Sequence, residues 1–173
     1  MSKGITIEES IKTKSYWLKN EISQSNLSNI EASDILIVPF EAFRDKSEFV
    51  FHQGTATLFS YLKSHLENDL TIDICIDDDQ YQEIVLHSQT HRISEIVVTL
   101  LAAPLLVNLL SSYIDDQIKA EPKDDVEASI IIEDNQCRGF QFNYRGEAKD
   151  FNQLSDAVGE FVKKCTPQSK NKK

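Results

Sequence analysis

The chain has 173 residues, of which 40% are hydrophobic and 27% are charged, with only 5 Gly and 4 Pro. This composition is typical of a folded globular protein and excludes a collagen-like, low-complexity or wholly disordered chain. The formal net charge is −10, although residues 163–173 carry five lysines, so the rest of the chain holds 13 basic against 28 acidic residues. An acidic body of this kind repels phosphate backbones, and we therefore expect no general binding to nucleic acids.

The three cysteines are Cys75, Cys137 and Cys165, an odd number at wide spacing. This pattern is typical of a reducing compartment rather than of a disulfide scaffold. The first ten residues lack the apolar core of a signal peptide, so we expect a cytoplasmic protein. Residues 1–165 are predicted to form a single α/β domain. Residues 166–173 are predicted to be a disordered lysine-rich tail, because they contain no apolar residue that could anchor them.

The first elements are predicted from short local patterns. Thr6 and Glu9 have the spacing of a capping box, and the apolar positions that follow predict a helix over residues 6–22. The unbroken apolar run at 35–38 is rich in β-branched residues and predicts a strand that is covered on both faces. Pro39 would end regular pairing there.

The next segments alternate between strand and helix patterns. Residues 48–51 predict a short strand, and residues 53–66 predict a helix with leucines at positions i, i+4 and i+8. His52 lies at this junction, where backbone N–H groups can face an anion, although the one glycine, Gly54, is far short of a phosphate-binding loop. Residues 71–77 predict a half-buried strand with isoleucines on one face and Asp73 and Asp77 on the other.

Three consecutive aspartates, Asp77 to Asp79, follow this strand. We interpret Asp79 as the N-cap of a helix over residues 80–87, with the other two carboxylates favoured by the helix dipole. The alternative is a divalent-metal site that uses Asp73 and Asp77 at the carboxyl end of the strand. We favour the capping interpretation because caps of this kind are much commoner than metal sites.

Residues 96–114 form a stretch of 19 uncharged residues, almost long enough to cross a bilayer. Pro104 lies in its middle, several polar residues interrupt it, and acidic residues flank both ends. These features favour a central helix that is buried in the core and is kinked or divided at Pro104. Part of its surface could also serve an interface with a partner or a second copy.

Residues 126–146 predict a β-hairpin with its turn at 134–138, and Asp150 begins a final amphipathic helix over residues 150–164. Together these elements predict an α/β fold. We expect a single domain with a mixed sheet of about five strands, a C-terminal β-hairpin, helices on both faces and a central apolar helix.

The hairpin would bring Asp125, at the start of its first strand, close to Glu147, at the end of its second, with Lys149 two residues further on. This arrangement resembles the acidic residue and Glu-x-Lys pair of restriction-endonuclease-like nucleases. In that family two carboxylates hold Mg²⁺ and the lysine polarises the attacking water. The resemblance covers only residues 123–149, and Gly146 is expected to end the strand before Glu147.

No phosphate loop, convincing metal set or nucleophile motif is present in the sequence. We therefore expect a non-catalytic protein-binding or accessory subunit with a protein partner or a homo-oligomeric state, and no cofactor. A first alternative is a small metal-dependent hydrolase or nuclease that uses Mg²⁺ with Asp125, Glu147 and Lys149. A second alternative is a membrane-associated protein that inserts residues 96–114, which the acidic body makes less favourable.

Overall fold

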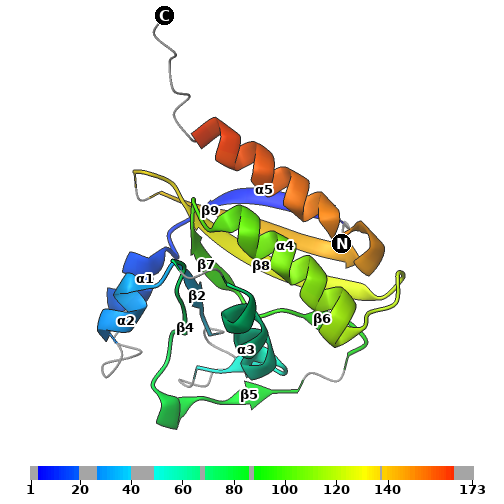
Figure 1. Ribbon diagram of the computed structural model, residues 1–173, viewed down its shortest axis with the longest axis horizontal. Coiled ribbons are helices and arrows are strands. Elements are labelled where there is room, and N and C mark those ends of the chain that lie inside the picture. Colours follow the sequence, from blue (N-terminus) through cyan, green and yellow to red (C-terminus); the bar gives the residue numbers. More distant parts are fainter. Residues whose placement is uncertain are drawn as a thin grey trace, which may run out of the picture.

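The computed structural model describes residues 4–19, 27–39, 49–66, 69–85, 88–136 and 138–165, which form a mixed α/β domain (Figure 1). The helices are α1 (Lys14–Lys19), α2 (Leu27–Ala32), α3 (Thr55–His65), α4 (Ala103–Tyr113) and α5 (Asn152–Cys165). The strands are β1 (Gly4–Ser10), β2 (Ile35–Ile37), β3 (Phe51–His52), β4 (Ile72–Ile74), β5 (Glu83–Ile84), β6 (His91–Arg92), β7 (Ile96–Thr99), β8 (Asp125–Glu133) and β9 (Gly139–Glu147).

The main sheet has seven strands, six of them in the order β1-β9-β8-β7-β2-β4, and β6 also pairs with β8. β9 is antiparallel to both of its neighbours, β1 and β8. In contrast, β7 is parallel to β8, and β2 is parallel to β4. Parallel neighbours need a crossover connection, which α3 supplies between β2 and β4 and α4 supplies between β7 and β8. The α/β class, the mixed sheet and the C-terminal hairpin are confirmed, and the sheet is larger than the five strands expected.

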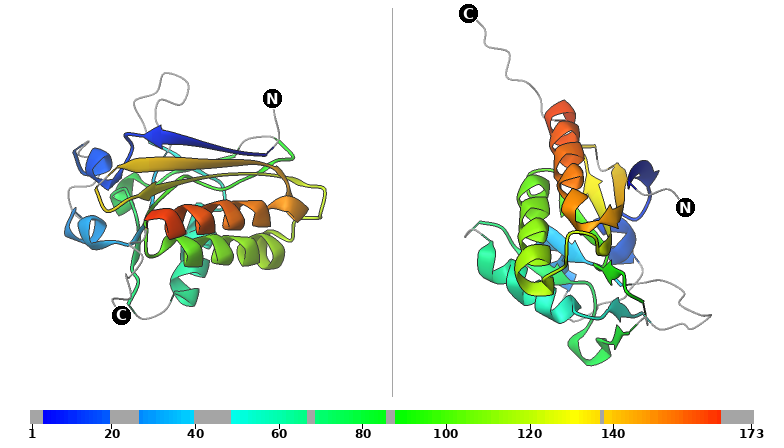
Figure 2. Two further views of the ribbon diagram at one scale, coloured as in Figure 1. Left: turned by 90° about the horizontal axis from the view of Figure 1, so that it is seen from above. Right: turned by 90° about the vertical axis from the view of Figure 1, so that its right-hand side faces the viewer.

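Helices lie on both faces of the sheet, as predicted. α4 and α5 lie side by side on one face (Figures 1 and 2), where the rings of Phe142 and Tyr144 in β9 contact Phe161 and Phe151. Alternate residues of a strand point to the opposite face. On that face the backbone N–H of Lys14, the first residue of α1, donates a hydrogen bond to the carboxylate of Glu133.

The apolar stretch at 96–114 is not one helix, and this prediction is corrected. Residues Ile96–Thr99 form β7, where β-branched side chains fit a buried strand, and α4 begins only at Ala103. Pro104 lies in the first turn of α4, the position where a missing N–H does not matter. α4 does occupy the core, since Leu106, Val107 and Leu110 are all 0% exposed. Within the described residues, no helix is long and apolar enough to cross a membrane.

Two other predicted helices are wrong. Residues 4–10 form β1 instead of the start of a helix over 6–22, because β9 offers them a complete antiparallel partner in which Ile7 pairs with Phe142. Residues 83–84 form β5, which pairs with β3, where a helix over 80–87 was expected. In both cases a partner strand far away in the sequence overrides a weak local helix signal.

Candidate functional site

A polar groove of about 470 Å³ lies on the face of the sheet opposite α4 and α5. Its wall residues come from β3, β6, β8 and β9 and from the segments that follow β1, β2 and β6. The charged residues among them are Lys12, Arg92, Glu95, Glu127 and Arg145, and the uncharged polar ones are His52, Ser94, Ser129 and Asn143, with Tyr144 also at the wall. Because the groove is mostly polar, it suits a polar ligand better than an apolar one.

Strand register creates the charge cluster of this groove. Glu127 of β8 lies directly opposite Arg145 of β9, and it also pairs with Arg92 of β6. The Nε atom of Arg92 is 3.1 Å from Oε2 of Glu127, and the Nε atom of Arg145 is 3.2 Å from Oε1. One carboxylate is therefore held between two guanidinium groups. Sequence reasoning missed this triad, because its members are 35 and 18 residues apart in the chain and only the register reveals them.

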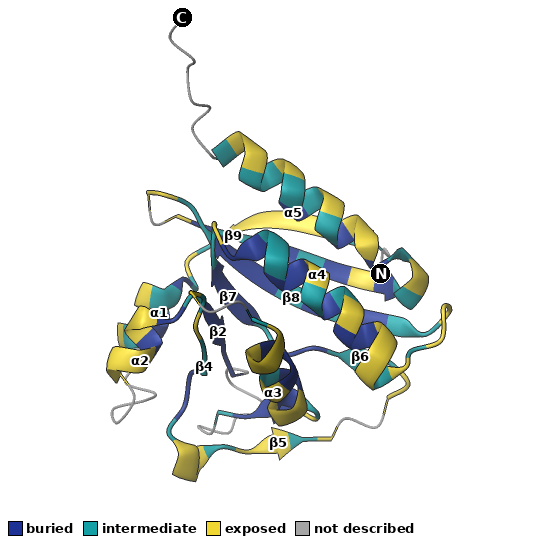
Figure 3. Ribbon diagram, in the orientation of Figure 1, coloured by how far each residue is buried: buried dark blue, intermediate teal, exposed yellow. Residues whose placement is uncertain are grey.

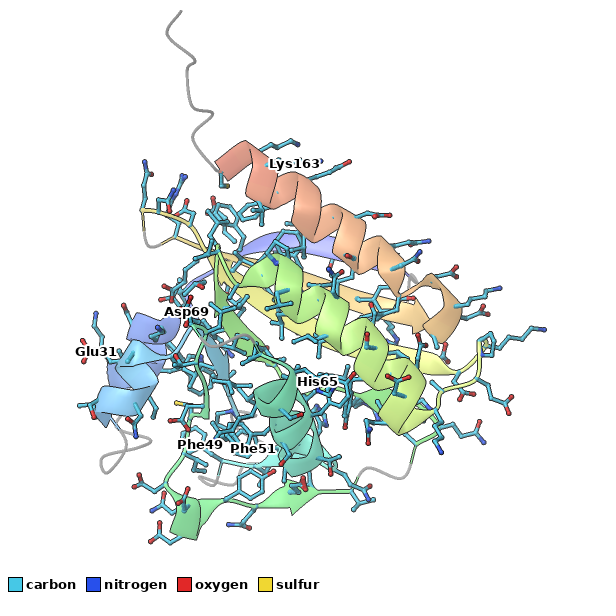
Figure 4. All side chains as sticks on the ribbon, viewed as in Figure 1. Glu31, Phe49, Phe51, His65, Asp69 and Lys163 are labelled. Carbon is cyan, nitrogen blue, oxygen red and sulfur yellow. The ribbon has the colours of Figure 1, made fainter. Side chains whose placement is uncertain are left out.

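A second cavity, of about 330 Å³, shares His52, Arg92, Ile93 and Ser94 with the groove. His52 is 9% exposed. Burial, with a further contribution from the charge of Arg92, lowers the pKa of His52 to about 4. The imidazole is therefore neutral at neutral pH. Phe51, the preceding residue in β3, is completely buried beside α3 (Figure 4) and fixes the position of this junction.

The hydroxyl groups near His52 form a closed ring of hydrogen bonds. The backbone N–H of His52 donates to Oγ of Ser94 (3.2 Å), and Oγ1 of Thr55 donates to the backbone carbonyl of His52 (2.7 Å). Because the Thr55 proton is used there, the 2.7 Å contact between the two hydroxyls requires Ser94 to donate to Thr55. Both buried hydroxyls are thus satisfied within the protein. They connect the β3–α3 junction to the segment around Ser94.

The predicted nuclease-like residues are brought together as the hairpin required. Asp125 lies opposite Glu147 in the β8–β9 register, and Nζ of Lys149 is 3.0 Å from Oε2 of Glu147. The hydrogen bond and charge of Glu147 raise the pKa of Lys149. Within the described ranges, no group of three or more His, Cys, Asp or Glu side chains is arranged to hold a metal ion. The use of Asp125, Glu147 and Lys149 in catalysis stays a prediction.

The strand does not end at Gly146, as had been expected, but continues to Glu147. A Cβ atom at Gly146 would lie 2.8 Å from the hydroxyl oxygen of Tyr144, so only glycine fits there without a shift of that ring. The Tyr144 hydroxyl donates to the backbone carbonyl of Glu147 at 2.5 Å. Burial, together with the charges of Asp150, Glu147 and Asp125, raises the pKa of Tyr144 to about 12. Tyr144 is therefore uncharged at neutral pH, and its hydrogen bond stabilises this end of the hairpin.

The predicted metal pair Asp73 and Asp77 does not share a strand. β4 ends at Ile74, whose backbone N–H donates to Oδ1 of Asp73 at 2.8 Å, and Asp77 is the N-cap of a 3₁₀ turn at Asp78–Gln80. Burial raises the pKa of Asp73 against the lowering effect of that hydrogen bond, and the charge of Asp78 raises it further. The capping role expected for Asp79 is corrected, because this turn starts two residues earlier. A metal at Asp73 and Asp77 stays a prediction.

Cys75 is a buried thiol. Burial, with the charge of Asp73, raises the pKa of Cys75 to about 12, so its thiol stays protonated at neutral pH. Cys137 and the lysine-rich residues 166–173 lie outside the described residues.

The outer edge of β1 is the second candidate site. β1 lies at one end of the sheet, and no strand in the described part of the chain pairs with its outer edge. Residues 6–9 are exposed along its length (Figure 3), and Ile7 is 54% exposed. Glu8 and Glu9 point to opposite faces because side chains alternate along a strand. Among the residues that the structure describes, the edge therefore offers unpaired backbone groups with a carboxylate on each side.

Comparison with known proteins identifies no relative. No protein-family model, no curated protein and no solved structure matches the chain significantly.

Proposed function

We propose that this chain is a non-catalytic accessory subunit that binds a partner protein by receiving an extended segment at the outer edge of β1. The observation that carries the proposal is the seven-residue strand β1, whose outer edge is unpaired within the described residues. In an antiparallel edge strand about half of the residues direct their N–H and C=O groups away from the sheet. A strand from another protein satisfies these groups, which is the general basis of binding by strand addition.

The opposite end of the sheet supports the choice of β1. The strand at that end, β4, has only three residues, and α2 and α3 contact it. Short, covered edge strands are poor templates for pairing. β1 is more than twice as long, and α5 packs on the neighbouring strand β9 instead of covering the β1 edge. We therefore place the partner strand at β1 rather than at β4.

Charge complementarity indicates that the bound segment is basic. Glu8 and Glu9 provide a carboxylate on each face of β1, and the whole chain carries a net charge of −10. An opposite charge placed directly across a strand pair contributes roughly 0.2–1 kcal/mol. A second copy of this chain would bring the same two glutamates and the same net charge to the interface. We therefore favour a foreign basic segment over a homodimer.

The first experiment uses two synthetic strand-forming peptides that share the same pattern of apolar residues. The first peptide carries lysines at the remaining positions, and the second carries glutamates. Fluorescence anisotropy measures their binding to the whole protein. We expect only the lysine peptide to bind, and we expect the double substitution Glu8→Lys/Glu9→Lys to reverse that preference. Asp115→Lys/Asp116→Lys is the matched control, because both aspartates are exposed and the change in net charge is identical.

Two outcomes would count against the proposal. Equal weakening by the two double substitutions would show a general charge effect without a site at β1. Failure of either peptide to bind at moderate salt would remove the support for strand addition. Size-exclusion chromatography with light scattering separates the remaining possibility, because a homodimer formed through β1 would be strengthened by added salt, which screens the repulsion between the glutamates of the two copies.

The nuclease alternative has one specific observation in its favour, the pairing of Asp125 with Glu147 beside Lys149. It predicts Mg²⁺-dependent cleavage of DNA that Glu147→Gln abolishes. Glu160→Gln, at an exposed position of α5, is the control substitution and should retain the activity. Wild-type protein that does not cleave DNA with Mg²⁺, or cleavage that survives Glu147→Gln, would reject this alternative.

A further inference from the structure

The groove carries more positive than negative charge, although the chain as a whole is acidic. Three cationic side chains, Lys12, Arg92 and Arg145, face two acidic ones, Glu95 and Glu127, at its walls. The excess is independent of the titration of His52, because burial and Arg92 keep that imidazole neutral. A concave site with low-dielectric walls concentrates the field of such charges and attracts ions of the opposite sign.

The two arginines already hold one carboxylate in the geometry that an anionic ligand would need. Glu127 is 28% exposed and receives contacts of 3.1 Å and 3.2 Å from the Nε atoms of Arg92 and Arg145. Each guanidinium has five N–H donors in a planar fork that matches carboxylate and phosphate groups. Both arginines contact Glu127 through their Nε atoms. Glu127 thus sets the spacing of two guanidinium groups that border an open volume.

The floor of the groove is made of neutral hydrogen-bonding groups. Nε2 of Gln141 donates to Oγ of Ser129 (2.8 Å) and to Oδ1 of Asn143 (3.1 Å), which orients these side chains along the sheet. Ser129 and Asn143 line the groove beside the arginines. A volume of about 470 Å³ is within the usual range for a small-molecule site. The polar floor and cationic wall together select a ligand with a polar body and an anionic group.

We propose that this groove binds a small polar organic anion, whose carboxylate or phosphate group is held by Arg92 and Arg145 beside Glu127. The site is separate from the outer edge of β1, so it does not depend on the function proposed above. Glu127 acts as an internal competitor, since its carboxylate occupies the same guanidinium groups as the ligand. Affinity for the anion is consequently limited by a negative charge that a single substitution can remove.

The test titrates the whole protein with two probes, citrate and inorganic phosphate, by isothermal calorimetry and by amide chemical-shift mapping. We expect saturable binding of at least one probe, with the largest shifts at residues 127–129 and 143–145. The relative affinities of the two probes distinguish a carboxylate from a phosphate ligand. Arg145→Gln should weaken binding about tenfold or more, because a charge-assisted contact is lost. Glu127→Gln should strengthen it severalfold.

Arg138→Gln is the matched control, because Arg138 is an exposed arginine of the same hairpin that pairs with Asp134 instead of facing the groove. Thermal unfolding verifies that each variant is folded. Three results would each overturn the inference: no saturable binding of either probe, equal weakening by Arg145→Gln and Arg138→Gln, or shifts confined to residues outside the groove. Loss of peptide binding at β1 would leave this result unchanged, so the two proposals fail separately.

Discussion

The outer edge of β1 and the groove lined by β8 and β9 lie on one sheet, yet they present opposite chemistry. The edge is exposed, flanked by Glu8 and Glu9, and its binding groups belong to the backbone. The groove is concave, has an excess of cationic side chains, and its binding groups are set by cross-strand register. In our two proposals, one sheet carries an acidic site for an extended basic segment and a cationic site for a small anion. The difference shows that strand order determines the first site and side-chain register determines the second.

The largest effect should come from a substitution that disrupts both regions together. Phe142 is 0% exposed in β9, pairs with Ile7 of β1 and with Ile130 of β8, and contacts the ring of Phe161. We expect Phe142→Ala to lower the free energy of unfolding by about 3–5 kcal/mol, because it leaves a cavity at the centre of the hairpin. Urea unfolding followed by circular dichroism measures this. Gln141→Ala, on the polar face of the same strand, is the control and should cost about 1 kcal/mol or less.

A smaller effect, the pH dependence of the free energy of unfolding that His52 causes, should distinguish the groove from the edge. The pKa of His52 is about 4 in the folded chain against 6.5 for an unperturbed histidine, so the unfolded chain binds more protons between these limits. The contribution of neutral His52 to the free energy of unfolding should therefore be complete above pH 6.5 and should fall as the pH is lowered towards 4. Because the ring borders the groove, we expect a loss of roughly 1–3 kcal/mol from this residue.

The measurement is the free energy of unfolding in urea at pH 7 and at pH 4.5, for the wild type and for His52→Asn. The wild type should lose more stability than the variant over this interval. Identical pH dependence in the two proteins would show that His52 is not the group responsible. The substitution His52→Asn should leave peptide binding at β1 unchanged, since the edge contains no histidine.

The smallest effect concerns the edge alone. Glu8 and Glu9 are exposed, and the one hydrogen bond between them and other side chains in the described part of the chain joins Nδ2 of Asn143 to Glu8 at 3.4 Å. We expect Glu8→Lys/Glu9→Lys to change the free energy of unfolding by less than about 0.5 kcal/mol. Thermal and urea unfolding check this. A large loss of stability would mean that the two glutamates support the fold itself, and the peptide experiment would then no longer isolate the β1 edge.

Local patterns were sufficient for elements whose partners are close in the sequence. The alternation of Phe140, Phe142 and Tyr144 predicted β9, and the short turn before it predicted its pairing with β8. That pairing in turn placed Asp125 opposite Glu147, as the structure shows. The helices α3 and α5 were likewise predicted from apolar residues at helical spacing. In each case the evidence lies within about 25 residues of the chain.

The remaining features depend on contacts that are remote in sequence. β1 was mistaken for a helix because Thr6 and Glu9 imitate a capping box, and its true partner Phe142 follows 135 residues after Ile7. The groove could not be predicted for the same reason, since Arg92 reaches Glu127 only through the parallel pairing of β6 with β8. Pro104 was recognised as a break, but the sequence did not show that a strand precedes it.

Amide hydrogen exchange of Gly4 to Ser10, with and without the lysine peptide, tests strand addition at β1 most directly. In the free protein, the amides that point away from β9 should exchange quickly, in alternation with slow ones that pair with it. Binding should slow the fast set selectively and leave the amides around Arg92 and Glu127 unchanged. Bound peptide with unaltered exchange in β1, or protection located in the groove instead, would contradict the assignment of this strand as the partner-binding edge.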